Sequence, residues 1–236
     1  TYLGFQTFSK TIDVKPGENV LDVSLKLSAI EMEEVIVSTP FHKLQSENVV
    51  KVEYANVASL KRKGAITLAD GITNIAGVES VSTGIGIGKP VIRGLSANRV
   101  LVYTQGIRLE NQQFGDEHGL GVSDAGIESV EVIKGPASLL YGSDAMGGVL
   151  YLNPEKFASS NSTDGDINLN YFSNTEGYST NAGFKTSGEN LKFIVRGGTT
   201  SHVDYKTGDG ERVTNSRFKE NNLKTGIAYQ RTKFNT

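Results

Sequence analysis

Apolar and polar residues alternate in four segments near the end of the chain, which are “DINLNYF”, “TNAGFKT”, “LKFIVRG” and “LKTGIAYQ”. A period of two gives a strand one apolar and one polar face. The connection “SGEN” is a tight turn, whereas “TSHVDYKTGDGERVTNSRFKENN” is long and polar. Transmembrane barrels combine short inner turns with longer outer loops. A soluble antiparallel meander shows the same alternation, so the pattern leaves both structures open.

The beginning of the chain also carries a strand pattern. In “NVLDVSLKLS” the apolar residues recur at every second position, and “KPGEN” before it predicts a turn. We expect residues 1–30 to be the end of a small β-sandwich. Residues 31–47 read as a linker, in which “EEVIVS” is a short β-prone string between acidic residues and Pro40. Such a segment either pairs with the edge of another sheet or is an ordinary connecting strand.

Residues 48–154 mix helix and strand patterns. Helices are expected over Ala55–Arg62 and Thr67–Ile75, with Thr67 as the N-cap of the second and Gly77 as its stop. “PVIRGL”, “NRVLVYTQGIRL” and “IESVEVIKG” predict strands. Since the smaller part of this segment is helical, the class it favours is α+β.

The stretch “IESVEVIKGPASLLYGSDAMGGVLYLNP” predicts a compact reversal of the chain. Pro136 suits the first position of a short helix over residues 136–141, and Gly142 suits its end. Gly147 and Gly148 then let the backbone bend and approach another surface before the next strand.

Composition excludes several classes of protein. The chain has 236 residues, a formal net charge of −2 and no cysteine. Disulfides, thiolate metal sites and a cysteine nucleophile are therefore excluded, and the charge gives no sign of nucleic-acid binding. No run of about 18 apolar residues predicts a transmembrane helix. Because both ends lie beside strand patterns, we interpret the chain as part of a longer protein.

The candidate chemical motifs do not support an enzyme. “TGIGIGKP” has Thr83 where a phosphate loop needs glycine, and Pro90 where it needs serine or threonine. There is no G-x-S-x-G nucleophile motif. In “GDEHG”, Asp116, Glu117 and His118 offer ligands for a metal or a metal complex. Adjacent residues of an extended loop point in different directions, so a solvated loop is the favoured interpretation, and we expect neither a resident metal nor a cofactor.

The motifs “VIRGL”, “NRVLVYTQGIRLENQQFGDEHG” and “IESVEVIKGPASLLYGSDAMGGVLYLN” resemble, in order and spacing, the plug domain of TonB-dependent outer-membrane receptors. The first residues look like the end of the carboxypeptidase-regulatory-like β-sandwich that precedes the plug in Bacteroidetes-type receptors. The resemblance divides the chain into a sandwich remnant (1–30), a linker (31–47), an α+β plug domain (48–154) and about four antiparallel strands of an incomplete transmembrane barrel (155–236).

The resemblance implies an active importer in the outer membrane of a Gram-negative bacterium, with the plug facing the periplasm. The plug fills a barrel of about 22 strands, and a small-molecule ligand binds from outside. Implied partners are TonB with ExbB and ExbD, the rest of the barrel, and outer-membrane lipid. TonB pairs with a short strand before the plug. The candidate for this TonB box is Glu33, Glu34, Val35, Ile36, Val37 and Ser38.

The resemblance also implies roles for particular side chains. Basic residues of such plugs face acidic groups on the barrel wall, and by motif position these are Arg93 and Lys134, for which plain strand-end solvation is the alternative. Ligand contacts come from outward plug loops, here “STGIGIGKP” and “ENQQFGDEHGLG”. The candidate ligand-binding residues are Gln112, Gln113, Phe114, Asp116 and His118.

The cargo and two alternatives remain open at this stage. A ferric siderophore is the favoured cargo, with cobalamin, another metal complex, a glycan or a peptide as further candidates. A signalling receptor would use the same plug. A soluble secreted binding module or adhesin would instead pack residues 167, 169, 171, 191, 193 and 195 into one core.

Overall fold

The computed structural model describes residues 16–17, 23–24, 52–113, 115 and 118–229. The chain divides into two units, Thr1–Val49 and Val50–Thr236. The predicted TonB box and nearly all of the predicted sandwich remnant lie outside the described residues. Within the described ranges, no helix is both long and apolar enough to cross a bilayer.

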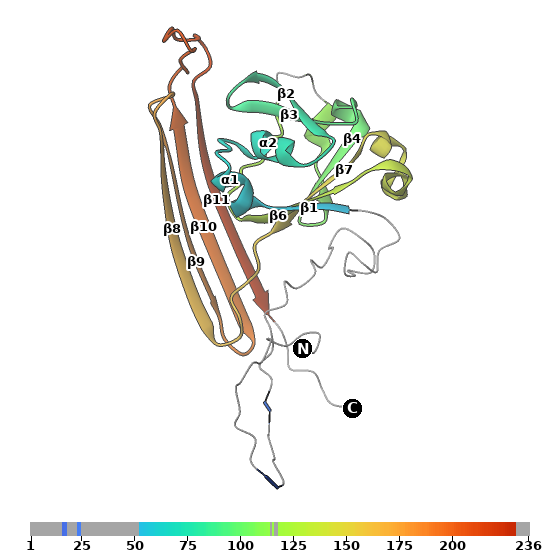
Figure 1. Cartoon of the computed structure of the whole chain (residues 1–236), viewed down its shortest axis with the longest axis vertical. Helices are drawn as coiled ribbons and strands as arrows, with labels where there is room; N and C mark the ends of the chain where they lie inside the picture. The colour runs from blue at the N-terminus through green and yellow to red at the C-terminus, as the bar shows by residue number, and fades with distance from the viewer. Residues whose placement is uncertain (1–15, 18–22, 25–51, 114, 116–117, 230–236) are drawn as a thin grey trace. The chain divides into compact units, whose positions relative to one another are not determined.

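A five-stranded sheet forms the centre of the α+β domain (Figure 1). Its strands, in spatial order, are β1 (Val52–Asn56), β6 (Ile127–Ile133), β7 (Gly148–Pro154), β4 (Val100–Thr104) and β5 (Ile107–Arg108). Only β4 and β7 pair in parallel. One face of the sheet supplies Val130, Val132, Leu150 and Leu152 to the apolar core.

Two short helices bury their apolar side chains in the same core. Helix α1 (Val57–Arg62) begins after Asn56, whose side chain accepts the Ser59 amide hydrogen. It starts later than expected because Ala55 and Asn56 belong to β1. Helix α2 (Leu68–Gly71) begins after Thr67, and the predicted N-cap is confirmed because its hydroxyl accepts the Asp70 amide hydrogen at 3.2 Å.

The remaining helical turns of the domain are of the tighter 3₁₀ type. They are η2 (Ile72–Asn74), η3 (Ala97–Arg99), η4 (Glu110–Gln113), η5 (Gly135–Tyr141) and η6 (Ser143–Met146). The helix predicted over residues 136–141 is confirmed as η5. A separate hairpin pairs β2 (Val78–Gly84) with β3 (Ile87–Ile92), so the glycine-rich “TGIGIGKP” lies in a hairpin.

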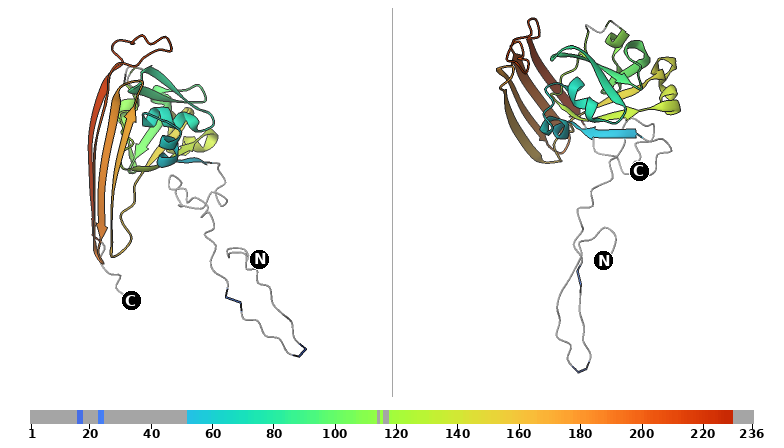
Figure 2. Two further views of the ribbon diagram at one scale, coloured as in Figure 1. Left: turned by 60° about the vertical axis from the view of Figure 1, so that its left-hand side comes forward. Right: turned by 45° about the horizontal axis from the view of Figure 1, so that its top comes forward.

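Four long antiparallel strands follow the α+β domain, as predicted. They are β8 (Ser162–Phe172), β9 (Gly177–Ser187), β10 (Leu191–His202) and β11 (Phe218–Tyr229). Each has 11 or 12 residues, enough for a tilted strand to span a bilayer, which takes about 9–11. These strands form one sheet beside the α+β domain (Figure 2).

The two faces of this sheet differ in polarity. The apolar side chains that alternate along the strands share the outer face, where Ile167, Leu169 and Leu223 are 72–74% exposed. The prediction that these side chains form the core of a soluble adhesin is therefore wrong, because they pack against no second layer of the described residues. We call the sheet of β8–β11 the wall. Its other face, the inner face, is polar and lies toward the α+β domain.

Candidate functional site: the contacts between plug and wall

Arg196 of β10 is the centre of the contact between the α+β domain and the inner face of the wall. Its guanidinium donates to Glu155 Oε2 at 2.5 Å, to Asp166 Oδ1 at 2.6 Å and to Asn181 Oδ1 at 2.6 Å. The Arg196 side chain is only 11% exposed. Glu155 directly follows β7, so Arg196 ties the exit of the α+β domain to strands β8, β9 and β10.

Strand register explains how one arginine reaches across three strands. Gly183 of β9 pairs with Arg196 on one side and with Asp166 of β8 on the other. A Cβ atom at Gly183 would lie 2.4 Å from Cζ of Arg196. Because Gly183 has no side chain, the Arg196 guanidinium can cross β9 and reach Asp166.

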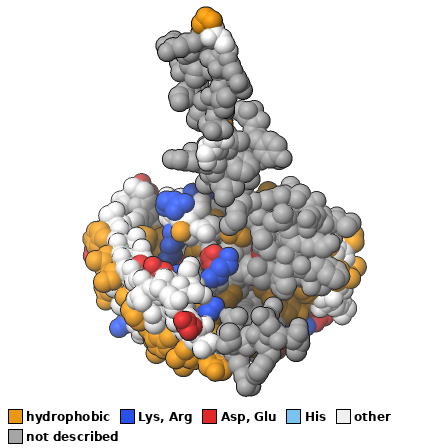
Figure 3. All heavy atoms as spheres, turned by 90° about the horizontal axis from the view of Figure 1, so that it is seen from below, with side chains coloured by type: hydrophobic (Ala, Val, Ile, Leu, Met, Phe, Trp, Pro, Cys, Tyr) orange, Lys and Arg blue, Asp and Glu red, His pale blue; other side chains and the backbone are white. Residues whose placement is uncertain are grey.

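A hydrogen bond and a close approach join the domain to β11. Asn222 donates to the hydroxyl of Ser123 at 3.2 Å, and a Cβ at Gly126 would lie 3.0 Å from Cδ of Lys224. Asp124, next to these contacts in sequence, pairs with Lys61 of α1 at 2.6 Å. Seen from below, charged side chains gather toward the middle of the molecule and hydrophobic ones along parts of its edge (Figure 3).

A cavity of about 580 Å³ separates the domain from the wall beyond these contacts. On the domain side it is lined by the connection between α1 and α2, by residues 120–124 and by Gly86 and Gly88. On the wall side it is lined mainly by polar residues, including Asn170, Thr200 and Asn222. The lining is therefore mixed, with mainly polar residues on the wall side and both polar and apolar residues on the domain side.

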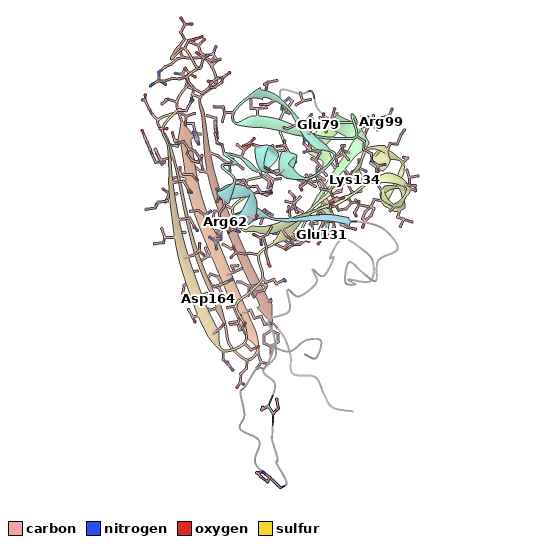
Figure 4. The ribbon with its side chains drawn as sticks, viewed as in Figure 1. Arg62, Glu79, Arg99, Glu131, Lys134 and Asp164 are labelled. Carbon is pink, nitrogen blue, oxygen red and sulfur yellow. The ribbon has the colours of Figure 1, made fainter. Side chains whose placement is uncertain are left out.

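The two predicted docking residues do not contact β8–β11. Lys134 is largely buried within the α+β domain, where it pairs with Glu53 at 3.6 Å and donates to the carbonyl oxygen of Ala76. It lies on the side of the domain away from the wall strands (Figure 4). Arg93 is exposed, and its guanidinium lies beside Gly135. Docking of these residues onto further barrel strands stays a prediction.

The predicted ligand-binding residues lie in different environments. Gln112 is buried, and its amide donates to the carbonyl oxygen of Leu120 at 3.1 Å. In this conformation it belongs to the interior, contrary to its predicted outward position. His118 is exposed. Phe114 and Asp116 lie outside the described residues, and only the backbone of Gln113 is described. Among described residues, no group of three or more His, Asp or Glu is placed to hold a metal.

Sequence reasoning missed a buried polar row on the second face of the five-stranded sheet. Register aligns Glu131 with Tyr151, and Tyr151 with Tyr103. Glu131 is fully buried and accepts from the Asn153 amide at 2.7 Å, while Tyr141 packs edge-on against Tyr103. Burial, and then the nearby Tyr151 and Glu131, raise the pKa of Tyr141 to about 12. Only the pairing of distant strands brings these groups together.

The outer ends of the wall strands are held by an ion cluster. Glu176, between β8 and β9, pairs with Lys206 at 3.0 Å and with Arg212 at 2.5 Å. The hydrogen bond from Lys206 and the charge of Arg212 lower the pKa of Glu176. Both basic residues lie in the long polar connection between β10 and β11, so the cluster ties that connection to the neighbouring turn.

Polar contacts hold the α+β domain against the inner face of the long antiparallel strands, whose outer face is apolar. This is the architecture of a plugged outer-membrane barrel. Residues 45–149 match the family described as TonB-dependent Receptor Plug Domain. The copper transporter OprC matches 75% of this chain with 28% of its own, at a TM-score of 0.63 and 22% identity. The FrpB iron transporter from Neisseria meningitidis gives the same coverage at a TM-score of 0.61 and 17% identity.

Curated relatives match by sequence. The vitamin B12 transporter BtuB of Vibrio vulnificus (strain YJ016) is 29% identical over 140 residues, which are 58% of this chain and 22% of that protein. The heme/hemopexin utilization protein C of Haemophilus influenzae is 40% identical over 93 residues, which are 39% of this chain and 13% of that protein. This chain therefore spans less than a quarter of either relative.

Residues 45–149 are a TonB-dependent receptor plug domain, and the first antiparallel wall strands follow it. Receptors of this family lie in the Gram-negative outer membrane, with the plug facing the periplasm. The Bacteroidetes type and the preceding β-sandwich stay predictions.

Proposed function

We propose that the receptor containing this chain imports a scarce small-molecule nutrient in a TonB-energised, ligand-gated step, with this chain supplying the plug. The observation that carries the proposal is the polar contact between plug and wall around Arg196. Asp166 is 45% exposed, so water replaces this partner of Arg196 at modest cost. A plug held in this way stays seated at rest and is released by applied force.

A ferric siderophore or another metal complex is the cargo class that we propose. The relatives support this class by their names, which refer to vitamin B12, heme, copper and iron. Copper and iron are metals, and vitamin B12 and heme are complexes that contain a metal ion. We further propose that Gln113, Phe114, Asp116 and His118 contact the ligand, and that Glu33–Ser38 pairs with TonB, which works with ExbB and ExbD.

Growth of a deletion strain tests the proposed import. The gene for the full-length receptor is removed, and growth is measured with limiting cyanocobalamin, haemin, a ferric siderophore or copper. We expect growth to fail on one supplement and to return when the receptor is supplied on a plasmid. Normal growth on every supplement would contradict import of this cargo class.

Replacing Ile36 with proline in the full-length receptor tests the coupling segment. Proline removes a backbone donor and interrupts a paired strand. We expect Ile36→Pro to abolish uptake while the receptor level and ligand affinity stay unchanged, and Ile36→Val to behave as wild type. Uptake is measured with the supplement that the growth panel identifies. Normal uptake by Ile36→Pro would place the coupling segment elsewhere.

A further inference from the structure

Lys89, in the glycine-rich “TGIGIGKP”, is a fully buried basic residue of the plug hairpin. Its ammonium group donates to the backbone carbonyl of Gln112 at 3.3 Å and to that of Gly115 at 2.8 Å. Both acceptors lie in “ENQQFGDEHGLG”, more than 20 residues further along the chain. Lys89, which does not fit a phosphate-loop motif, binds the backbone of the plug's candidate ligand loop.

A buried ammonium group needs a physical reason. Moving a charge out of water is costly, and its partners recover that cost only where their geometry is good. A buried ion pair that is replaced as a whole by apolar side chains of similar volume often costs no stability, so burial of a charge is weak evidence for a stabilising role. Stability of the hairpin alone is therefore a weak explanation for Lys89, whereas a need to fix the facing loop in one arrangement explains both hydrogen bonds.

Other contacts hold the same loop against β3. The Leu120 amide donates to the carbonyl of Gly88 at 2.8 Å, and the Gln112 side chain donates to the carbonyl of Leu120 at 3.1 Å. Gln112, Leu120 and Lys89 thus link the beginning of the loop, its end and the hairpin. The bonds of Lys89 and Gly88 tie the loop to β3, and the bond between Gln112 and Leu120 joins the two ends of the loop.

Gly119 allows this close approach, and Gly88 allows β3 to pack closely on β2 and α2. A Cβ at Gly119 would lie 3.1 Å from the backbone nitrogen of Gly88. A Cβ at Gly88 would lie 2.7 Å from the hydroxyl oxygen of Ser80 and 2.9 Å from Cβ of Ala69. A side chain at Gly119 would push the loop away from β3 and move the carbonyl oxygens away from Lys89, whereas one at Gly88 would clash with β2 and α2.

We propose that Lys89 is a positioning residue of the ligand site. Its ammonium group holds the backbone carbonyls of Gln112 and Gly115, so this backbone is fixed in one arrangement before a ligand arrives. The inference rests on the proposed function, because it assigns ligand contact to that loop. Fixing a loop beforehand removes the ordering cost from binding, and a smaller competent fraction weakens the apparent affinity in proportion.

The test compares Lys89→Met, Lys89→Arg and the exposed-site control Lys63→Met in the purified full-length receptor. Hydrogen exchange reports on the Leu120 amide, and equilibrium binding uses cyanocobalamin and haemin as probes. For Lys89→Met we expect about tenfold faster exchange and, for the probe that wild type binds, an about tenfold higher Kd, as for a competent fraction reduced to about a tenth. Lys89→Arg keeps the donors and restores most of both properties.

Uptake kinetics separate positioning from general damage. If Lys89 acts on the loop, Lys89→Met raises the KM of uptake and leaves the maximal rate per receptor unchanged. Unchanged exchange at Leu120, or a lower maximal rate with an unchanged Kd, would overturn the proposal. If wild type binds neither probe, the proposed cargo class loses support, while the exchange result still decides whether Lys89 fixes the loop.

Discussion

Replacement of Gly148 by alanine is expected to destabilise the plug by about 3 kcal/mol, through backbone strain added to a steric clash. Gly148 has φ of +152°, which side chains rarely adopt. An added Cβ would lie 2.8 Å from the carbonyl oxygen of Ile133 and 3.1 Å from Cγ2 of Ile92. Both neighbours are buried in the plug, so neither has room to move away.

Two measurements on the full-length receptor check this expectation. Hydrogen exchange of the β6 and β7 amides reports the free energy of opening of the sheet. Sensitivity of cells to a large antibiotic reports leakage through a barrel whose plug is unfolded. The matched control is Gly84→Ala, because a Cβ at Gly84 meets no atom within 4 Å. Equal exchange and equal sensitivity in the two variants would contradict the role of Gly148.

The sequence contains enough local information to predict most of the elements. Strict alternation predicted β8–β11, because a strand with one lipid-facing side and one polar side has a period of two. The chain reversal at Pro136 and the N-cap at Thr67 could also be predicted, because each depends only on residues nearby in the sequence. The first helix was predicted to start too early because Ala55, a strong helix former, is paired in β1 instead, where tertiary context overrides propensity.

The functional contacts were harder to predict because they depend on strand register. Nothing near Arg196 in sequence indicates that Gly183 and Asp166 lie in the same row across three strands. Gln112 was expected to face outward because the resemblance places it in an outward plug loop, yet a buried amide is stable where its donors find carbonyl partners. In “TGIGIGKP” the residues argue against a phosphate-loop motif, but they give no sign that Lys89 binds the backbone of another loop.

Replacement of Arg196 by methionine is expected to weaken the contact between the wall strands and the segment at Glu155, where the chain leaves the plug. Methionine keeps much of the apolar stem but removes the hydrogen bonds to Glu155, Asp166 and Asn181. Loss of one partner from a buried ion pair is strongly destabilising, but Asp166 is 45% exposed and solvent screens it. We therefore expect a loss of about 1–2 kcal/mol in the stability of this contact.

Hydrogen exchange at residues 153–158 of the full-length receptor measures this loss. Arg196→Lys should fall between wild type and Arg196→Met, because an ammonium group cannot form the bidentate contacts of a guanidinium. Arg212→Met is the matched control, since it removes an arginine–carboxylate pair at the outer end of the wall.

Gly183→Ala provides an independent route to the same state, because its Cβ would occupy the position of the Arg196 guanidinium. We expect it to increase exchange at residues 153–158 about as much as Arg196→Met, and the double variant to add little, since both changes remove one interaction. Fully additive effects would show that Gly183 and Arg196 act separately. In that case the row across β8, β9 and β10 would not be what holds the plug to its wall.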